Sequence, residues 1–198
     1  EIQRDAAQSA ASASVAPVYD PPDTRISRQQ VTNAQAALNF INSVRSDSYA
    51  TSQQKSLDLA ELTEVDLTQA TIIVILGMQD IRWDATKTEV MRVIEEVMSD
   101  QVRSDQLVQA QQRIPSLVSV MLSVEEAKIV SSIAGEFIIP NSLFNEVATN
   151  QARASALEAV EPVQAIFGQG QTIVGRGQVV EELDMEAMQA LGLLEKEI

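Results

Sequence analysis

The sequence predicts a mostly helical α+β fold in one domain, residues 1–198, with a small β element formed by its N-terminal and C-terminal segments. Three observations lead to this prediction. Apolar residues recur at helical spacing through most of residues 24–136. Two capping-box sequences mark helix starts within that region. Glycine and β-branched residues gather in residues 163–180, a pattern typical of a hairpin with turn glycines.

Composition excludes several classes of function. The chain has 28 acidic and 14 basic residues, which argues against a nucleic-acid groove and against docking on an anionic lipid surface. It has no histidine and no cysteine, so serine–histidine catalysis, thiolate catalysis, disulfides and most zinc sites are excluded. We therefore predict no catalytic residue, no metal and no cofactor, although hydrolysis by two carboxylates and an all-oxygen metal site stay formally open.

The first elements follow from prolines and caps. A short helix is predicted over residues 1–14, followed by an extended segment over residues 15–22, where three prolines exclude a helix. Ser27 is predicted as the N-cap of a long helix that ends at about Arg45. Residues 46–56 are polar and predict a loop.

The middle of the chain mixes strong and weak signals. Residues 57–78 predict one or two short helices, but residues 72–76 are also compatible with a buried strand, because periodicity cannot decide so short a run. Residues 86–89 fit a capping box and predict a helix start there. Residues 103–121 look helical, with a break or kink at Pro115.

The remaining elements alternate helix and extended chain. Residues 123–126 form a second capping box, and Gly135 is predicted to end the helix that follows. Residues 137–141 predict an extended segment, and a further helix is expected from about residue 145 to 160. The last helix, within residues 181–192, opens with acidic side chains at its positive dipole end.

The two ends of the chain repeat one pattern, a small-residue helix followed by Val-x-Pro-Val, over residues 4–20 and 146–165. The coinciding pairs are Ala7 with Ala152, Ala11 with Ala156, Val15 with Val160, Pro17 with Pro162, and Val18 with Val163. Small residues at i and i+4 allow a helix to lie close to its neighbour. We therefore expect the beginning and the end of the chain to form one layer.

These repeats and the motifs around them resemble a known family, the extracellular domain of the seven-transmembrane HD-hydrolase receptors. The residues that carry the resemblance are Pro17, Val18, Pro140, Asn141, Thr149, Arg153, Pro162, Val163, Gly170, Gly177 and Gly192. One departure is that Gln8 stands in the first repeat where the second has Arg153. If Arg153 forms an ion pair or holds a ligand, the first repeat cannot do the same.

The resemblance implies an extracellular sensor-like domain at the cell membrane, tethered by flanking transmembrane helices. Its partners would be those helices and an unidentified extracellular ligand or protein, and a homodimer is compatible with this arrangement. A cytoplasmic HD phosphohydrolase acting on cyclic di-AMP would complete the parent protein. That catalytic motif needs histidine, so it cannot lie in this chain. Because both ends must re-enter one membrane, Glu1 and Ile198 are expected on the same side.

Two side chains are weak candidates for ligand binding. Arg153 can pair bidentately with a carboxylate or phosphate, although a structural ion pair with Glu146 or Glu158 is the favoured interpretation. Trp83, the single tryptophan, can form a ligand platform but is favoured as a core anchor. The glycines of residues 168–177 can cradle an anion, but they match no phosphate-binding motif, and turns are favoured.

Two other functions stay open at this point. One is a soluble helical scaffold or chaperone-like module without a membrane link. The other, weaker, is a hydrolase that uses two carboxylates. The adjacent pairs Glu95–Glu96 and Glu125–Glu126 do not support it, because neighbouring residues on a helix point in different directions.

Overall fold

The computed structural model describes residues 2–160, 168 and 170–194. These residues form nine α-helices, one short 3-10 helix and no β-strand, so the mostly helical prediction is confirmed and the small β element is wrong. The chain divides into two compact units. Unit 1 combines Glu1–Val18 with Asn145–Ile198, and unit 2 is the continuous segment Tyr19–Phe144. The single domain over residues 1–198 stays a prediction.

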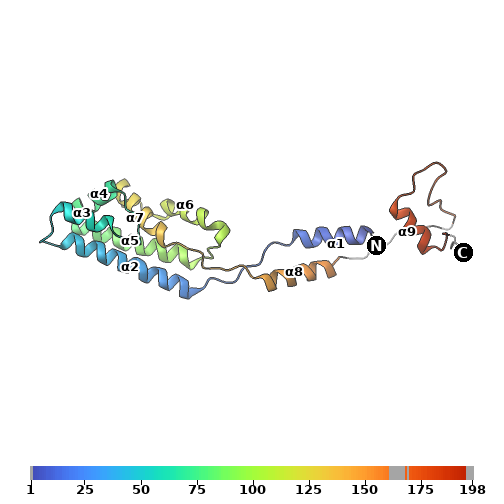
Figure 1. Ribbon diagram of the computed structural model, residues 1–198, viewed down its shortest axis with the longest axis horizontal. Coiled ribbons are helices and arrows are strands. Elements are labelled where there is room, and N and C mark those ends of the chain that lie inside the picture. Colours follow the sequence, from blue (N-terminus) through green and yellow to red (C-terminus); the bar gives the residue numbers. More distant parts are fainter. Residues whose placement is uncertain (1, 161–167, 169, 195–198) are drawn as a thin grey trace. The chain divides into compact units, whose positions relative to one another are not determined.

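Unit 2 is an all-helical lobe (Figure 1). Its elements are α2 (Thr24–Ser46), α3 (Ser52–Ala60), α4 (Gln69–Gly77), α5 (Asp80–Ser99), the 3-10 helix η1 (Ser104–Gln106), α6 (Leu107–Leu117) and α7 (Val124–Phe137). Helix α5 packs against both α2 and α7, and α6 covers α7. Helices α3 and α4 pack against each other, and α3 also contacts α2.

The core of unit 2 is almost entirely aliphatic, as the low aromatic content predicts. It lies between α2, α5 and α7, with contributions from the segments that join them. Its largest fully buried side chains are Trp83, Leu38, Ile41, Leu59, Ile72, Ile75, Ile94, Met98, Ile114, Ile133, Ile138 and Val65. Burying each such aliphatic side chain contributes about 1.5–3 kcal/mol, which makes this core the main source of stability.

Helix α2 begins one turn earlier than predicted. Its N-cap is Asp23, whose carboxylate accepts a hydrogen bond from the Arg25 amide at 2.8 Å. The Arg25 side chain also bonds that carboxylate and lowers the pKa of Asp23 to about 2. Ser27, the predicted cap, instead donates to the Met98 carbonyl at 2.8 Å, so the prediction of Ser27 as the N-cap is wrong.

The region before α5 holds two short helices, which confirms one prediction for residues 57–78 and rules out the strand over residues 72–76. The predicted loop over residues 46–56 is too long, because Thr51 and Gln54 form a capping box that starts α3. In α4, the Thr68 hydroxyl accepts from the Thr71 amide and fixes a helical start.

Helix α5 starts at Asp80, not at the predicted capping box of residues 86–89. Thr86 lies inside the helix and its hydroxyl donates to the Arg82 carbonyl at 2.9 Å, a bond that a mid-helix threonine can form. Glu89 is buried and accepts from Arg92. The capping-box sequence of residues 86–89 therefore does not begin a helix, because the side chains of Thr86 and Glu89 form hydrogen bonds with other partners.

Two breaker residues act later than expected. Helix α6 runs through Pro115 to Leu117, so the predicted break at Pro115 is not found. A proline so near the end of a helix removes only one hydrogen bond. Helix α7 begins at the predicted box, where Ser123 accepts from the Glu126 amide, but continues past Gly135 to Phe137.

Unit 1 contains α1 (Ile2–Ser14), α8 (Glu146–Glu158) and α9 (Glu182–Ala190). All three helices were predicted, and Asn145 caps α8 through its side chain, which accepts from the Ala148 amide at 2.7 Å. Helix α9 ends where Gly192 adopts a φ of 67°, a conformation that favours glycine. The Leu193 amide then donates back to the Met188 carbonyl at 2.8 Å and closes the helix end.

The predicted glycine hairpin over residues 163–180 forms turns in its described part. The Gln171 amide donates to the Gly168 carbonyl at 3.0 Å, and the Gln178 amide to the Gly175 carbonyl at 3.1 Å. Residues 172–174 have no paired strand among the described residues, and an unpaired strand is not stable. Pro162 and Val163 of the second Val-x-Pro-Val arm lie outside the described residues.

Candidate functional site

The best-built polar site of unit 2 centres on the side chain of Asn141, which is 1% exposed. Its amide oxygen accepts from the Val102 amide at 2.8 Å. Its amide nitrogen donates to the carbonyls of Met98 at 3.0 Å and Asp100 at 2.9 Å, and approaches the Ser27 hydroxyl at 3.4 Å. Asn141 thereby joins the end of α5, the start of α2 and the segment after α7.

The two chain segments that bound unit 2 are paired with each other next to Asn141. Tyr19 and Phe144 form an isolated antiparallel bridge, and the Asp20 amide donates to the Leu143 carbonyl at 2.8 Å. The Ser142 hydroxyl donates to the Asp20 carbonyl at 2.6 Å. We call the segments Tyr19–Asp23 and Asn141–Phe144, together with Val102 and Arg103, which pair with Asn141 and Ser142, the clasp.

Aromatic contacts cover the outer end of the clasp. The rings of Tyr19 and Phe144 meet edge to face, with centroids 5.9 Å apart. The Arg103 guanidinium lies 4.4 Å from the centroid of the Tyr19 ring, a cation–π contact. Arg103 also pairs with Asp105, which raises the pKa of Arg103 and lowers that of Asp105. These contacts hold the ends of unit 2 together independently of unit 1.

In unit 1, α1 and α8 lie side by side and antiparallel (Figure 1). The buried Thr149 hydroxyl accepts from the Val18 amide at 2.9 Å, and at the other end Gln8 donates to the Leu157 carbonyl at 3.3 Å. The repeated alanines of both helices are half-buried. The first repeat and the helix of the second therefore pack on each other, as the spacing of their small residues suggested.

The two predicted ligand candidates lie in different units. Trp83 is 1% exposed in the core of unit 2, where the Arg45 guanidinium lies 5.3 Å from its ring centroid. Arg153 is exposed on α8, and among the described residues it forms no ion pair with Glu146 or Glu158. The structure does not bring the two together, and ligand binding by either stays a prediction. The expected common side of Glu1 and Ile198 falls on residues outside the described ones.

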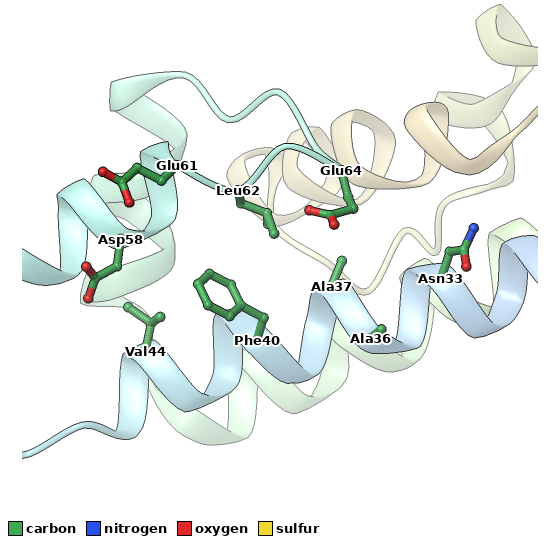
Figure 2. A pocket seen from close by; sticks show the side chains of 9 residues that line it. All are labelled: Asn33, Ala36, Ala37, Phe40, Val44, Asp58, Glu61, Leu62 and Glu64. Atoms are coloured by element: carbon green, nitrogen blue, oxygen red, sulfur yellow. The ribbon is translucent and has the colours of Figure 1, made fainter.

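Unit 2 also carries a groove of about 630 Å³ between α2 and the end of α3 (Figure 2). Its lining residues are Asn33, Ala36, Ala37, Phe40, Val44, Asp58, Glu61, Leu62 and Glu64. The floor is apolar, and three carboxylates stand on the opposite wall. Such a volume is within the range of about 300–1,000 Å³ seen for small-molecule sites.

The buried carboxylates elsewhere in unit 2 are structural. Glu126 pairs with Arg82, which is the main reason that the pKa of Glu126 lies below its ordinary value. Glu89 accepts from Arg92 at 2.7 Å and from the Ser119 amide at 2.6 Å, and its pKa is lowered chiefly by Arg92. In the described part of the chain, no group of acidic residues is arranged to hold a metal ion.

No sequence pattern reveals that Arg45 and Asn141 connect elements that are distant along the chain. Arg45 donates to the carbonyls of Ile75 and Met78 and pairs with Asp80 at 3.0 Å, so it holds the end of α4 and the start of α5. A cation there also opposes the negative end of the helix dipole. Asn141 was identified only by resemblance, because no local pattern reveals a partner 39 residues away.

Comparison with known proteins shows the class of protein to which this chain belongs. A family model described as 7TM-HD extracellular matches residues 1–195, which places the chain among extracellular domains of membrane proteins. The chain belongs to the 7TM-HD extracellular family, and the resemblance stated from its motifs is confirmed. Neither the curated proteins nor the solved structures contain a match. No helix in the described residues is long and apolar enough to cross a bilayer.

Proposed function

We propose that this chain is the extracellular sensory domain of a membrane-bound HD-type phosphodiesterase and transmits a signal across the membrane to it. The observation that carries the proposal is the family match over residues 1–195. The domain itself is not catalytic. A cytoplasmic HD domain that hydrolyses cyclic di-AMP would supply the chemistry, and the flanking transmembrane helices would be the immediate partners of this chain.

The connectivity of the two units supports a route for the signal. Unit 2 is one continuous insertion, so the chain passes between the two units at the peptide bonds Val18–Tyr19 and Phe144–Asn145. Contacts on both sides hold these two peptide bonds in place. In unit 2 they are the contacts of the clasp, and in unit 1 the Val18 amide donates a hydrogen bond to the Thr149 hydroxyl. A ligand or protein that prefers one packing of unit 2 would shift the population of that packing and act on the membrane through both links.

The antiparallel pairing of α1 and α8 fits this route. Because the pair is antiparallel, the start of α1 and the end of α8 lie at the same end of it. A change in how the two helices pack would thus reach the start of α1 and the end of α8 together. A second copy of the domain can amplify such a change, and a homodimer remains part of the proposal.

The extracellular placement is tested by labelling one introduced cysteine. The chain has no cysteine, and Tyr49 is 97% exposed, so Tyr49→Cys gives a single accessible thiol in a parent protein otherwise free of cysteine. We expect a membrane-impermeant maleimide to label this variant in intact cells, while the cysteine-free parent stays unlabelled. Labelling only after the membrane is permeabilised would contradict the proposal.

Transmission is tested by loosening the clasp in the membrane-inserted parent. Asn141→Ala removes the hub of the clasp, whereas Asn39→Ala changes an exposed asparagine on α2. We expect the first variant to change cyclic di-AMP hydrolysis in membrane vesicles and the second to leave it unchanged. Equal hydrolysis in both variants, with both correctly inserted, would contradict a signalling role for the clasp.

A further inference from the structure

The groove of unit 2 has an apolar floor formed by one face of α2. Ala37 and Val44 are nearly buried, and the Phe40 ring, 41% exposed, rises from α2 into the groove. Leu62 reaches toward it from the opposite wall (Figure 2). A partly exposed phenylalanine beside a half-buried leucine offers a surface on which an aliphatic chain can lie out of water.

The charges of the groove are placed at both ends of this apolar surface. Asp58 and Glu61 lie toward the Val44 end, and Glu64 lies toward the Ala37 end (Figure 2). From Ala37 to Val44 the helix rises by about 10 Å. An apolar stretch of that length with a carboxylate at each end is complementary to a molecule with two separated positive charges.

These carboxylates are available to an incoming cation. All three are exposed, and in the part of the chain that the structure describes none of them forms a salt bridge. Glu64 accepts one hydrogen bond from the neighbouring Thr63 hydroxyl at 3.2 Å. No lysine or arginine lines the groove, so nothing within it neutralises these charges.

We infer that this groove binds a linear aliphatic polyamine. Its terminal ammonium groups would pair with Glu64 at one end and with Asp58 and Glu61 at the other. The methylenes between them would lie on Phe40 and Leu62, and an inner ammonium would gain from the face of the Phe40 ring. The inference deepens the proposed sensory function, because it names the chemical class of a ligand for unit 2.

The same features disfavour other small ligands. An anion would face three carboxylates without a counter-charge. A divalent metal ion needs several oxygen atoms around one point, and the described residues contain no such group. A neutral apolar molecule would contact the apolar floor of the groove but would leave the three carboxylates without a partner. A polyamine would contact the floor through its methylenes and pair with the carboxylates through its ammonium groups.

The inference is tested by titrating the whole 198-residue chain with spermidine in a calorimeter. Butylamine provides one charge and one alkyl chain, and magnesium chloride provides charge without methylenes. We expect spermidine to bind at one site, butylamine at least about tenfold more weakly, and magnesium not to displace spermidine at equal concentration. No heat from spermidine at millimolar concentration, or displacement by magnesium, would overturn the inference.

A charge-matched pair of variants locates the site. The groove variant carries Asp58→Asn, Glu61→Gln and Glu64→Gln, and the control variant carries Asp66→Asn, Glu125→Gln and Glu136→Gln at exposed positions outside the groove. Both raise the net charge equally. We expect the groove variant to weaken spermidine binding by about tenfold or more and the control by less than about twofold. Equal weakening in both would show attraction to the overall charge and overturn the inference.

A third variant tests the apolar half of the site. Phe40→Ala removes the ring but no charge, and the side chain is exposed enough for the fold to be retained, which circular dichroism checks. We expect spermidine binding to weaken by about three- to tenfold. Unchanged binding would overturn the assignment of the methylenes to this floor. Cell-surface labelling of the parent is a separate measurement, so failure of the ligand and failure of the sensory function are distinguishable.

Discussion

Unit 1 and unit 2 differ sharply in how much they bury. Unit 2 contains the whole aliphatic core, whereas among the described residues of unit 1 only Thr149 and Ala187 are buried. Several large apolar side chains of unit 1 are exposed, among them Val147, Leu191 and Leu193. Since burial of apolar area is the dominant favourable term in folding, unit 2 has its own source of stability, and the described part of unit 1 has little.

This difference fits the proposed division of work. In the proposed function, unit 2 would keep its structure when it binds a ligand, and the pair of α1 and α8 would change its packing. A region with few buried contacts opens at low free energy, and moving elements are drawn from such regions. The contrast therefore teaches that unit 2 has the buried core to hold a preformed site, whereas the described part of unit 1 buries little apolar surface that would fix its packing.

The largest expected effect compares equivalent truncations in the two units. Leu38 is completely buried in unit 2, and Leu193 is 61% exposed in unit 1. We expect Leu38→Ala to lower the free energy of unfolding by about 3 kcal/mol, through lost burial and the cavity left behind. Leu193→Ala should change it by less than about 0.5 kcal/mol. Urea unfolding followed by circular dichroism measures both, and similar losses would contradict the comparison.

The clasp gives the next largest effect. Asn141→Asp keeps the size of the side chain but replaces the donating amide by a carboxylate that faces the carbonyls of Met98 and Asp100. We expect a loss of about 2–4 kcal/mol at pH 7, because the buried charge would keep one donor, the Val102 amide, but would face the two carbonyls that the amide nitrogen now satisfies. Asn39→Asp on the exposed face of α2 is the control. If Asn141→Asp lowers the free energy of unfolding no more than the control does, the hydrogen bonds of the Asn141 side chain contribute little to stability.

Acid should weaken unit 2 through Glu126. Arg82 lowers the pKa of this carboxylate below its value of 4.5 in an unfolded chain. The stability it contributes is therefore complete above that value and is lost as the pH falls through the folded pKa. We expect Glu126→Gln to cost about 1 kcal/mol at pH 7, a discounted figure because Arg82 is 43% exposed. The variant should also lose less stability than the wild type between about pH 5 and pH 3.

The neighbour Glu125 provides the matched control for this pH experiment. Glu125 is exposed on α7, so Glu125→Gln should leave both the free energy of unfolding at pH 7 and its dependence on pH nearly unchanged. Chemical unfolding at each pH separates the two variants. A steeper acid loss in Glu126→Gln than in the wild type would reverse the predicted sign.

The smallest effect concerns the helix pair of unit 1. Thr149→Val has the same shape but cannot accept from the Val18 amide or donate to the Asn145 carbonyl. We expect amides of residues 2–18 to exchange several-fold faster, for a cost of about 1 kcal/mol, while unit 2 is unaffected. Thr172→Val, at an exposed position, is the control. Equal exchange rates in both variants would contradict the role of Thr149 in holding α1 against α8.

Local chemistry explains which parts of the fold were predictable from the sequence. The capping box at Ser123 and the cap at Asn145 act within four residues, so their signals and their structures coincide. Thr86 belongs to the same kind of capping-box sequence, but the predicted helix start there is wrong, because α5 already begins at Asp80. The predicted glycine hairpin is not found in the described part of residues 163–180, because a strand needs a partner and glycine spacing does not reveal whether one exists.

The sites were less predictable because they depend on distant contacts. Asn141 meets Val102, and Arg45 meets Ile75 and Met78, across 30 residues or more of chain. The groove likewise joins α2 to residues after α3, and no sequence motif marks its carboxylates. The packing of α1 on α8 was the exception. The repeated alanine spacing predicted that the beginning and the end of the chain form one layer, although it did not predict that the two helices run antiparallel.

The most direct test of the contrast between the two units is hydrogen exchange of the intact chain, read by mass spectrometry. We expect amides in the centres of α2, α5 and α7 to exchange only through global unfolding, and those of α1, α8 and α9 to exchange orders of magnitude faster. Equal protection in both units would contradict a stable sensory lobe carried by a pliable helix pair.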